Sequence, residues 1–194
     1  MVTETVLVRI VEEYVFSNPP PRDILYLSHV DSVRNYALLL ASKIKSDKLV
    51  VELTALLHDI GKTKDLKNHH IESAKIAEPL LRKHGCDEKT IQKVVNCILT
   101  HRAERDDKAE TIEAQIIKDA DGIAFLDIET GTWIAFLYYM WLERKLSFEE
   151  GVKKTIIKTE NMYEKIETEE GKSIASSNYN KIKSLLSFPI KKMF

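Results

Sequence analysis

The sequence predicts an all-α protein: a compact helical bundle with a C-terminal helical extension. Apolar residues recur every three or four positions along almost the whole chain, which is the period of helices that bury one face. We find no stretch in which apolar and polar residues alternate as they do in a half-buried strand. The 194 residues are enough to enclose one substantial hydrophobic core.

The first three predicted helices are defined by their end signals. Residues 3–16 form a helix that ends before three consecutive prolines, because proline cannot continue a helix. A second helix begins at Ser28, since Ser28 and Asp31 have the spacing of a capping box. A third covers residues 47–60, and we expect Gly61 to close it as a C-terminal glycine.

The middle of the chain continues in the same way. A fourth helix covers residues 68–84, and Asp87 caps a fifth that ends near His101. A sixth begins near Thr111. The apolar run at 133–142 is much shorter than the roughly 20 residues needed to span a bilayer. It therefore predicts a buried helix.

The C-terminal part begins with a second capping box, Ser147 and Glu150, ahead of a charged helix that runs to about residue 168. A last helix ends in a basic tail, which we expect to pack on the body. We divide the chain into an N-terminal helix (1–21), a central domain (22–146) and a C-terminal helical extension of the same domain (147–194).

Charge and composition limit the partners. The chain has 29 basic and 30 acidic residues and a net charge of −1, so no overall field draws it to nucleic acid or to a membrane surface. We expect neither partner. The N-terminus lacks the basic start of a signal peptide, and we expect a cytoplasmic protein. Its two cysteines, Cys86 and Cys97, are expected to be reduced thiols.

Histidine is confined to one part of the sequence. The six histidines are residues 29, 58, 69, 70, 84 and 101, and none occurs in the last 93 residues. His58 and Asp59 follow a buried apolar helix, where an uncompensated carboxylate would be costly and a metal would satisfy it. Alone, such a pair could also be a helix end with a surface carboxylate. Imidazole with carboxylate suits Mn, Fe, Ni, Co or Zn better than Ca, and Mg is kept as an alternative.

The pair does not stand alone. The stretch Leu-Leu-His-Asp-Ile-Gly-Lys around it, with His29 upstream and Ala-Asp-Gly-Ile downstream, resembles the HD superfamily of metal-dependent phosphohydrolases, whose pattern is H…HD…D. The resemblance covers roughly residues 22–128 and implies an HD-type helical bundle. It also implies that one divalent metal is bound by His29, His58, Asp59 and a later aspartate.

Two aspartates compete for the last place. Asp119 and Asp121 are two residues apart, so on a helix they point about 200° from one another and cannot both face one ion. Each shares its face with apolar residues, so periodicity does not decide. The family pattern, Ala-Asp followed one residue later by Leu or Ile, favours Asp121. Asp119 would then support the ligands or cap a neighbouring helix.

Two other histidines extend the expected site. His70 opens the fourth helix and His101 closes the fifth. In binuclear members of the family, histidines at such places hold a second metal, and in members with one metal such residues contact phosphate. An HD-type di-iron oxygenase would need both as ligands. We interpret His69 and His84 as surface residues.

The resemblance implies a hydrolase that cleaves a phosphate ester of a nucleotide or a similar small molecule by means of a metal-activated water. We expect Asp59, Lys62 and Arg102 to act in catalysis, and Lys62, His70, His101 and Arg102 to contact substrate. The glycine after Asp121 departs from the Arg or Lys often found there, so no single substrate class is indicated.

The alternative function is that of a non-hydrolytic, metal-binding HD domain that acts as a ligand sensor or interaction module. Residues 133–141 are rich in aromatic side chains and could form a homo-oligomer face, although burial in the core is the simpler interpretation.

Overall fold

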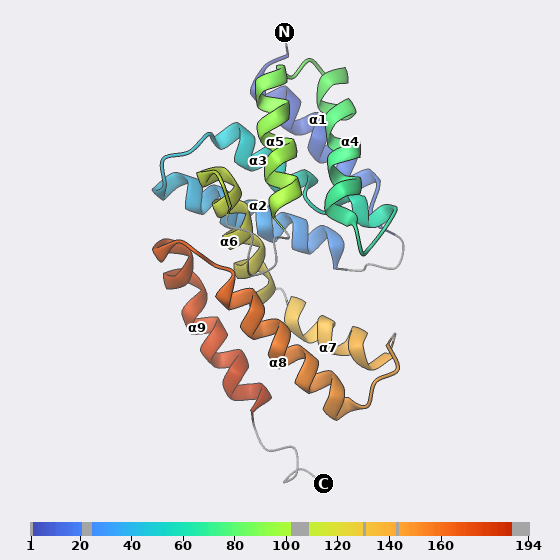
Figure 1. Ribbon diagram of the computed structural model, residues 1–194, viewed down its shortest axis with the longest axis vertical. Coiled ribbons are helices and arrows are strands. Elements are labelled where there is room, and N and C mark those ends of the chain that lie inside the picture. The colour runs from blue at the N-terminus through green and yellow to red at the C-terminus, as the bar shows by residue number, and fades with distance from the viewer. Residues whose placement is uncertain (1, 21–24, 102–108, 130, 143, 188–194) are drawn as a thin grey trace.

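The computed structural model describes residues 2–20, 25–101, 109–129, 131–142 and 144–187. Within these ranges the chain is helical and contains no strand, which confirms the all-α prediction (Figure 1). The described helices are α1 (Glu4–Ser17), α2 (Tyr26–Lys43), α3 (Lys48–Leu57), the 3₁₀ helix η1 (Ile60–Thr63), α4 (His69–Lys83), α5 (Glu88–Thr100), α6 (Ile112–Leu126), α7 (Thr132–Leu142), α8 (Phe148–Glu164) and α9 (Glu169–Leu186).

Most helices begin where their capping residues predict. The Asp87 side chain accepts from the Thr90 N–H at the start of α5, and Thr111 caps α6 in the same way. At α8 the complete capping box forms, with Ser147 and Glu150 each bonding the backbone of the other. These local hydrogen bonds satisfy N–H groups that have no partner within their own helix.

The capping box predicted at Ser28 is wrong. Helix α2 begins at Tyr26, its N-cap is Leu25, and no side chain caps it. The Ser28 hydroxyl donates instead to the Leu25 carbonyl at 3.2 Å. Tyr26 is only 1% exposed, so packing of this aromatic side chain extends the helix by half a turn beyond the polar signal.

The prediction for Gly61 is also wrong. Helix α3 ends at Leu57, and Gly61 lies inside η1 without the positive φ of a C-terminal glycine. It permits close packing of η1 against α4. A Cβ at this position would lie 2.1 Å from the His69 carbonyl oxygen and 2.4 Å from the Ser73 nitrogen. The Gly61 N–H donates to the Ser73 hydroxyl at 2.8 Å.

Buried side chains form two clusters. One combines α1, α3, α4 and α5 with the first turns of α2, and the other combines most of α2 with α6, α8, α9 and part of α3. Helices α2 and α3 contribute to both clusters and so join the two ends of the molecule. In Figure 1, α1, α4 and α5 lie at one end of the long axis, and α7, α8 and α9 lie at the other.

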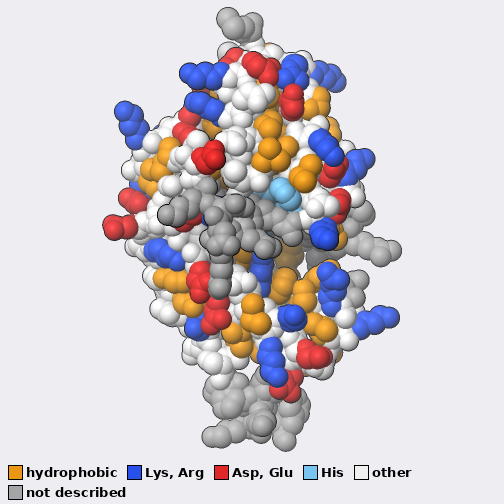
Figure 2. Space-filling view, viewed as in Figure 1, with side chains coloured by type: hydrophobic (Ala, Val, Ile, Leu, Met, Phe, Trp, Pro, Cys, Tyr) orange, Lys and Arg blue, Asp and Glu red, His pale blue; other side chains and the backbone are white. Residues whose placement is uncertain are grey.

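Helix α7 departs from the prediction of a buried helix. Only Trp133 is buried, whereas Tyr138 is 57% and Trp141 is 48% exposed. The helix packs on α8 and α6 along one side only, which leaves the other side at the surface. No helix among the described residues is long and apolar enough to cross a bilayer. Figure 2 shows acidic and basic side chains interspersed over the coloured part of the face it presents.

Candidate metal centre

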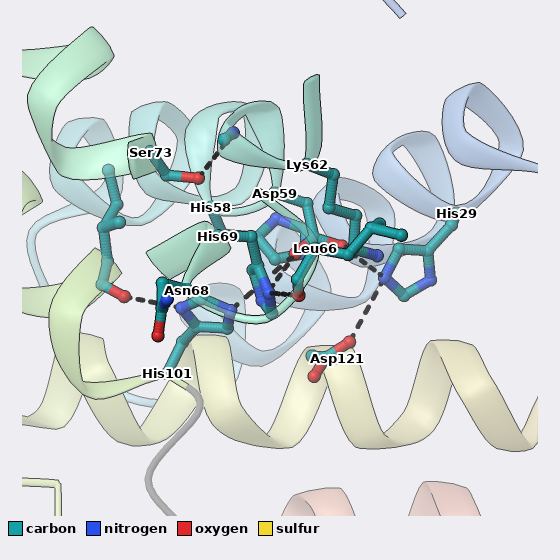
Figure 3. A network of polar contacts seen from close by, with 12 residues as sticks. His29, His58, Asp59, Lys62, Leu66, Asn68, His69, Ser73, His101 and Asp121 are labelled. Atoms are coloured by element: carbon teal, nitrogen blue, oxygen red, sulfur yellow. Dashed lines mark hydrogen bonds and ion pairs between the residues drawn. The ribbon is translucent and has the colours of Figure 1, made fainter. Parts of the chain in front are cut away.

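Four predicted site residues meet between the two clusters (Figure 3). His29 lies in the first turns of α2, His58 is the C-cap of α3, Asp59 follows it, and Asp121 lies in the middle of α6. His29 Nε2 lies 3.2 Å from Asp121 Oδ1 and 3.6 Å from Asp59 Oδ2. His58 Nε2 lies 3.4 Å from Asp59 Oδ2. Three segments far apart in sequence therefore converge on one small volume.

Three histidines of this centre are held in the same tautomer. In each, Nδ1 lies within hydrogen-bond distance of the backbone carbonyl three residues earlier, at 2.8 Å for His58, 2.5 Å for His101 and 3.0 Å for His69. A carbonyl only accepts, so Nδ1 carries the hydrogen and Nε2 keeps a lone pair. The Nε2 atom of His58 is buried and has no hydrogen-bond partner. This is the arrangement that a metal-ligating histidine requires.

The candidate ligand atoms fall into two groups. His29, His58 and Asp121 form one, and Asp59, His69 and His101 form the other, with the atoms of each group within 4.8 Å of one another. Asp59 lies between them: its Oδ2 faces the first group, whereas its Oδ1 lies 3.2 Å from His69 Nε2 and 3.8 Å from His101 Nε2.

His69 takes the place that we assigned to His70. The side chain of His69 is 12% exposed and faces Asp59, so its interpretation as a surface residue is wrong. His70 belongs to neither group, and its ring centroid lies 5.9 Å from that of His69. The two residues are adjacent at the start of α4 and point about 100° apart. Their sequence does not reveal which of them faces inward.

Asp119 and Asp121 have separate surroundings. Asp121 faces His29, whereas both oxygens of Asp119 accept hydrogen bonds from the start of α9. Asp119 Oδ1 accepts from the Glu167 N–H at 2.7 Å, and Oδ2 accepts from the Thr168 N–H at 3.0 Å and from its hydroxyl at 2.5 Å. Asp119 thus attaches α9 to α6, and Asp121 is the aspartate that lies at the centre.

Two lysines contact the carboxylates. Lys62 Nζ lies 2.5 Å from Asp59 Oδ2, on the η1 side of the centre. Lys165, the C-cap of α8, lies 2.5 Å from Asp121 Oδ2, and no motif in the sequence identified it. Arg102, the other cation that we predicted, lies outside the described residues.

The charges of the centre shift the pKa values of its groups. Burial raises the pKa of Asp59 and of Asp121, but nearby lysine and histidine charges lower both by more, to well below their usual range. Burial and the charge of His58 lower the pKa of His101 to about 3, so this imidazole is neutral. The pKa of His58 is lowered by burial and raised, by more, by Asp59 and Asp121. Two buried carboxylates thus make the centre attractive to a cation.

Comparison with known proteins agrees with this geometry. The sequence profile of the HD domain family matches residues 26–126, a span that includes His29, His58, Asp59 and Asp121. The chain belongs to the HD domain family. The resemblance noted in the sequence is therefore confirmed, and HD domains are generally metal-dependent phosphohydrolases.

Curated relatives share only part of their length with this HD-domain chain. It is 31% identical over 115 residues to the tRNA (cytidine(56)-2'-O)-methyltransferase of Picrophilus torridus, covering 54% of this chain and 33% of that protein. It is 36% identical over 100 residues to Ribonuclease Y of Alkaliphilus metalliredigens, covering 50% of this chain and 19% of that protein. The matched segment is thus a module within longer relatives.

Solved structures match nearly the whole chain. Bacillus subtilis YpgQ superimposes with a TM-score of 0.74 at 20% identity, over 97% of this chain and 99% of that chain. The structure of YpgQ in complex with ADP gives a TM-score of 0.70 at 19% identity, over 94% of this chain and 98% of that chain. At these identities the match establishes the HD-type fold, including its C-terminal helices.

Proposed function

We propose that this HD-domain chain is a metal-dependent phosphohydrolase that cleaves a phosphate ester of a nucleotide or a similar small molecule. The observation that carries the proposal is the convergence of His29, His58, Asp59 and Asp121, with a buried, partnerless Nε2 on His58. Family membership supports the reaction class.

The donor atoms fit a divalent metal. His29, His58, Asp59 and Asp121 would hold one ion, and Asp59, His69 and His101 would hold a second, with Asp59 shared. Imidazole and carboxylate donors favour Mn, Fe, Ni, Co or Zn. The hydrogen bonds of the Nδ1 atoms support the fit, because they hold each lone pair toward the centre in advance.

When bound, such a metal supplies an activated water and offsets negative charge on the phosphoryl oxygens. Side chains of the protein provide the further charge and the binding contacts. Lys62 Nζ, next to Asp59, is placed to pair with a phosphoryl oxygen as charge develops there. His101 is neutral and buried, so its ring does not repel a cation and its Nε2 lone pair is available to bind one. Burial of these groups strengthens each of these interactions by excluding water.

A nucleotide is the substrate class that we favour. The fold relative YpgQ has been crystallised in complex with ADP, and a curated relative of the matched segment is a ribonuclease by name. ADP, and the RNA on which a ribonuclease acts by its name, both contain phosphate attached to a nucleoside. Neither relative is similar enough over its length to identify one nucleotide.

The test combines elemental analysis with a phosphate-release screen on p-nitrophenyl phosphate and a nucleotide panel, each with Mn, Co, Ni and Mg. We expect Asp59→Asn to lose metal and to lower turnover by at least about 100-fold. Asp31→Asn is the matched control, because this substitution removes the same charge from an exposed position on α2. It should retain both metal and turnover. A wild-type chain that binds metal but releases no phosphate with any of these ions would favour the sensor or interaction module.

A further inference from the structure

Helix α8 brings two lysines to a centre that is otherwise built by α2, α3, η1, α4, α5 and α6. Lys165, at its C-terminal end, contacts the Asp121 carboxylate at 2.5 Å, and its side chain is only 17% exposed. Lys158 lies two turns earlier on the same side of α8. Neither residue belongs to the span matched by the HD family profile, which ends at residue 126.

Lys158 forms no ion pair with the carboxylates of the centre, although its charge interacts with theirs. Its Nζ lies 5.7 Å from the ring centroid of Phe125, which follows Asp121 by one turn on α6. Its charge interacts with Lys165, Asp121, Lys62 and Asp59, and burial lowers its pKa. Among the described residues, no carboxylate lies within 4.0 Å of this ammonium group.

A half-buried ammonium group without a carboxylate in direct contact is costly, because the group loses hydration and the more distant Asp121 and Asp59 offset only part of that loss. A cation–π contact with Phe125 offsets only part of that cost. The pattern is different for Lys62 and Lys165, each of which has a carboxylate partner. An anionic ligand that reaches beyond the carboxylates would provide Lys158 with the missing charge.

Charge at the centre indicates the size of that ligand. Three lysines (62, 158 and 165) outnumber the two carboxylates, and each divalent ion would add two further positive charges. A single phosphate group carries at most about two negative charges near neutral pH. Lys62 and Lys165 lie next to the side chains that would bind metal, where the first phosphate would bind. Lys158 lies two turns before Lys165 on α8.

We propose that Lys158 binds the second phosphate group of a substrate with two or more linked phosphates, so that α8 completes the active site and selects such substrates. The proposal rests on the proposed function, because that function places the first phosphate at the metal centre.

The test uses the full-length, metal-loaded chain and two non-hydrolysable probes. Methylenediphosphonate carries two linked phosphonates and methylphosphonate carries one, and both are measured by equilibrium dialysis at concentrations that leave the metal content unchanged. We expect the diphosphonate to bind wild type at least about tenfold more tightly. Lys158→Gln should weaken diphosphonate binding about tenfold and change methylphosphonate binding by less than about twofold.

Two further variants separate this role from a structural one. Lys158→Arg should retain most of the diphosphonate affinity, because it keeps the positive charge. Lys154→Gln removes an exposed lysine one turn earlier on α8 and should bind both probes as wild type does. Equal wild-type affinity for the two probes, or unchanged diphosphonate binding in Lys158→Gln, would overturn the proposal. Diphosphonate binding that depends on Lys158, in a chain that turns over no phosphate ester, would support this subsite while refuting the hydrolase function.

Discussion

At the scale of single residues, the centre depends on where helix α3 stops. Neighbouring residues within a helix point about 100° apart, so a helical His-Asp pair would not share a target. Here His58 is the C-cap with helical torsions, and Asp59 has already left them, with φ −112° and ψ 0°. The turn into η1 therefore lets both side chains face the same volume. It also places Asp59 between the two groups of histidines.

The two neighbouring histidines of α4 give the sharpest test of the second metal site. We expect wild type to bind two divalent ions per chain and His69→Ala to bind one, because only His69 faces Asp59. His70→Ala is the matched control and should keep both ions. Elemental analysis after removal of loosely bound metal measures the ratio. One ion per chain in wild type, or the loss of an ion from His70→Ala rather than His69→Ala, would refute this arrangement.

Sequence reasoning found residues that belong to a recognisable pattern and missed those that do not. His29, His58, Asp59 and Asp121 occur in a characteristic order, and the structure brings all four together. His69 was missed because a His-His pair at the first turn of a helix gives no periodic signal about its orientation. Lys165 was missed because it is one of many lysines in a charged helix, and only the packing of α8 on α6 places it at Asp121.

At the scale of elements, the position of α4 depends on the absence of a side chain in η1. A Cβ on Gly61 would overlap the backbone of α4 at His69 and Ser73. Gly61→Ala should therefore destabilise the fold by about 3 kcal/mol or more and displace His69 from Asp59. Urea unfolding and metal content would measure the two effects.

Gly151→Ala is the appropriate control for that substitution. A Cβ there would lie 3.3 Å from the end of the Leu137 side chain and no closer than 3.9 Å to any backbone atom of a neighbouring element, and alanine is the better helix former inside α8. We expect its stability to stay within about 1 kcal/mol of wild type. Equal stability of Gly61→Ala and wild type would show that η1 and α4 can separate without cost.

The start of α3 links to α5 through an ion pair that should depend on pH. The Asp47 carboxylate caps α3 and pairs with Lys93 Nζ at 2.9 Å; burial raises its pKa, and Lys93 and the backbone hydrogen bonds lower it by more. A carboxyl with a depressed pKa stabilises the fold above its ordinary value and loses that contribution as pH falls through the lowered one. Asp47→Asn, which can still cap, should be slightly less stable than wild type at pH 7, and this difference should shrink as pH falls below the ordinary carboxyl pKa. An undiminished difference at pH 3 would exclude the ion pair as its cause.

Helix starts were predictable where local chemistry sets them. At α5, α6 and α8 a side chain bonds a free backbone N–H, and the sequence located each start. At α2 the buried Tyr26 sets the start, and the polar signal at Ser28 was misleading. The exposure of α7 could not be predicted from sequence either, because an apolar sequence does not indicate how many neighbouring helices will pack against it.

At the scale of the whole molecule, the candidate ligands come from helices of both hydrophobic clusters. His58, Asp59, His69 and His101 come from the half that contains α3, α4 and α5, whereas Asp121 comes from α6 in the other half. His29 lies on α2, which contributes to both hydrophobic clusters. A divalent ion at this place would therefore hold together helices from both halves, and unfolding would have to release it.

Removal of the metal should consequently lower the thermal stability of the whole chain. A ligand present at about 100 times its dissociation constant stabilises a fold by about 2.7 kcal/mol, which corresponds to about 5–10 °C for a chain of this size. We expect EDTA to lower the Tm of metal-loaded wild type by that amount, as followed by circular dichroism at 222 nm, and excess Mn²⁺ to restore it. Asp121→Ala is the comparison, because without this carboxylate the ion no longer joins α6 to the other helices. Its Tm should fall less on EDTA treatment than that of wild type, because only the ion held by Asp59, His69 and His101 remains to be removed. A wild-type Tm that is the same with and without bound metal would show that the ion does not hold the two halves together.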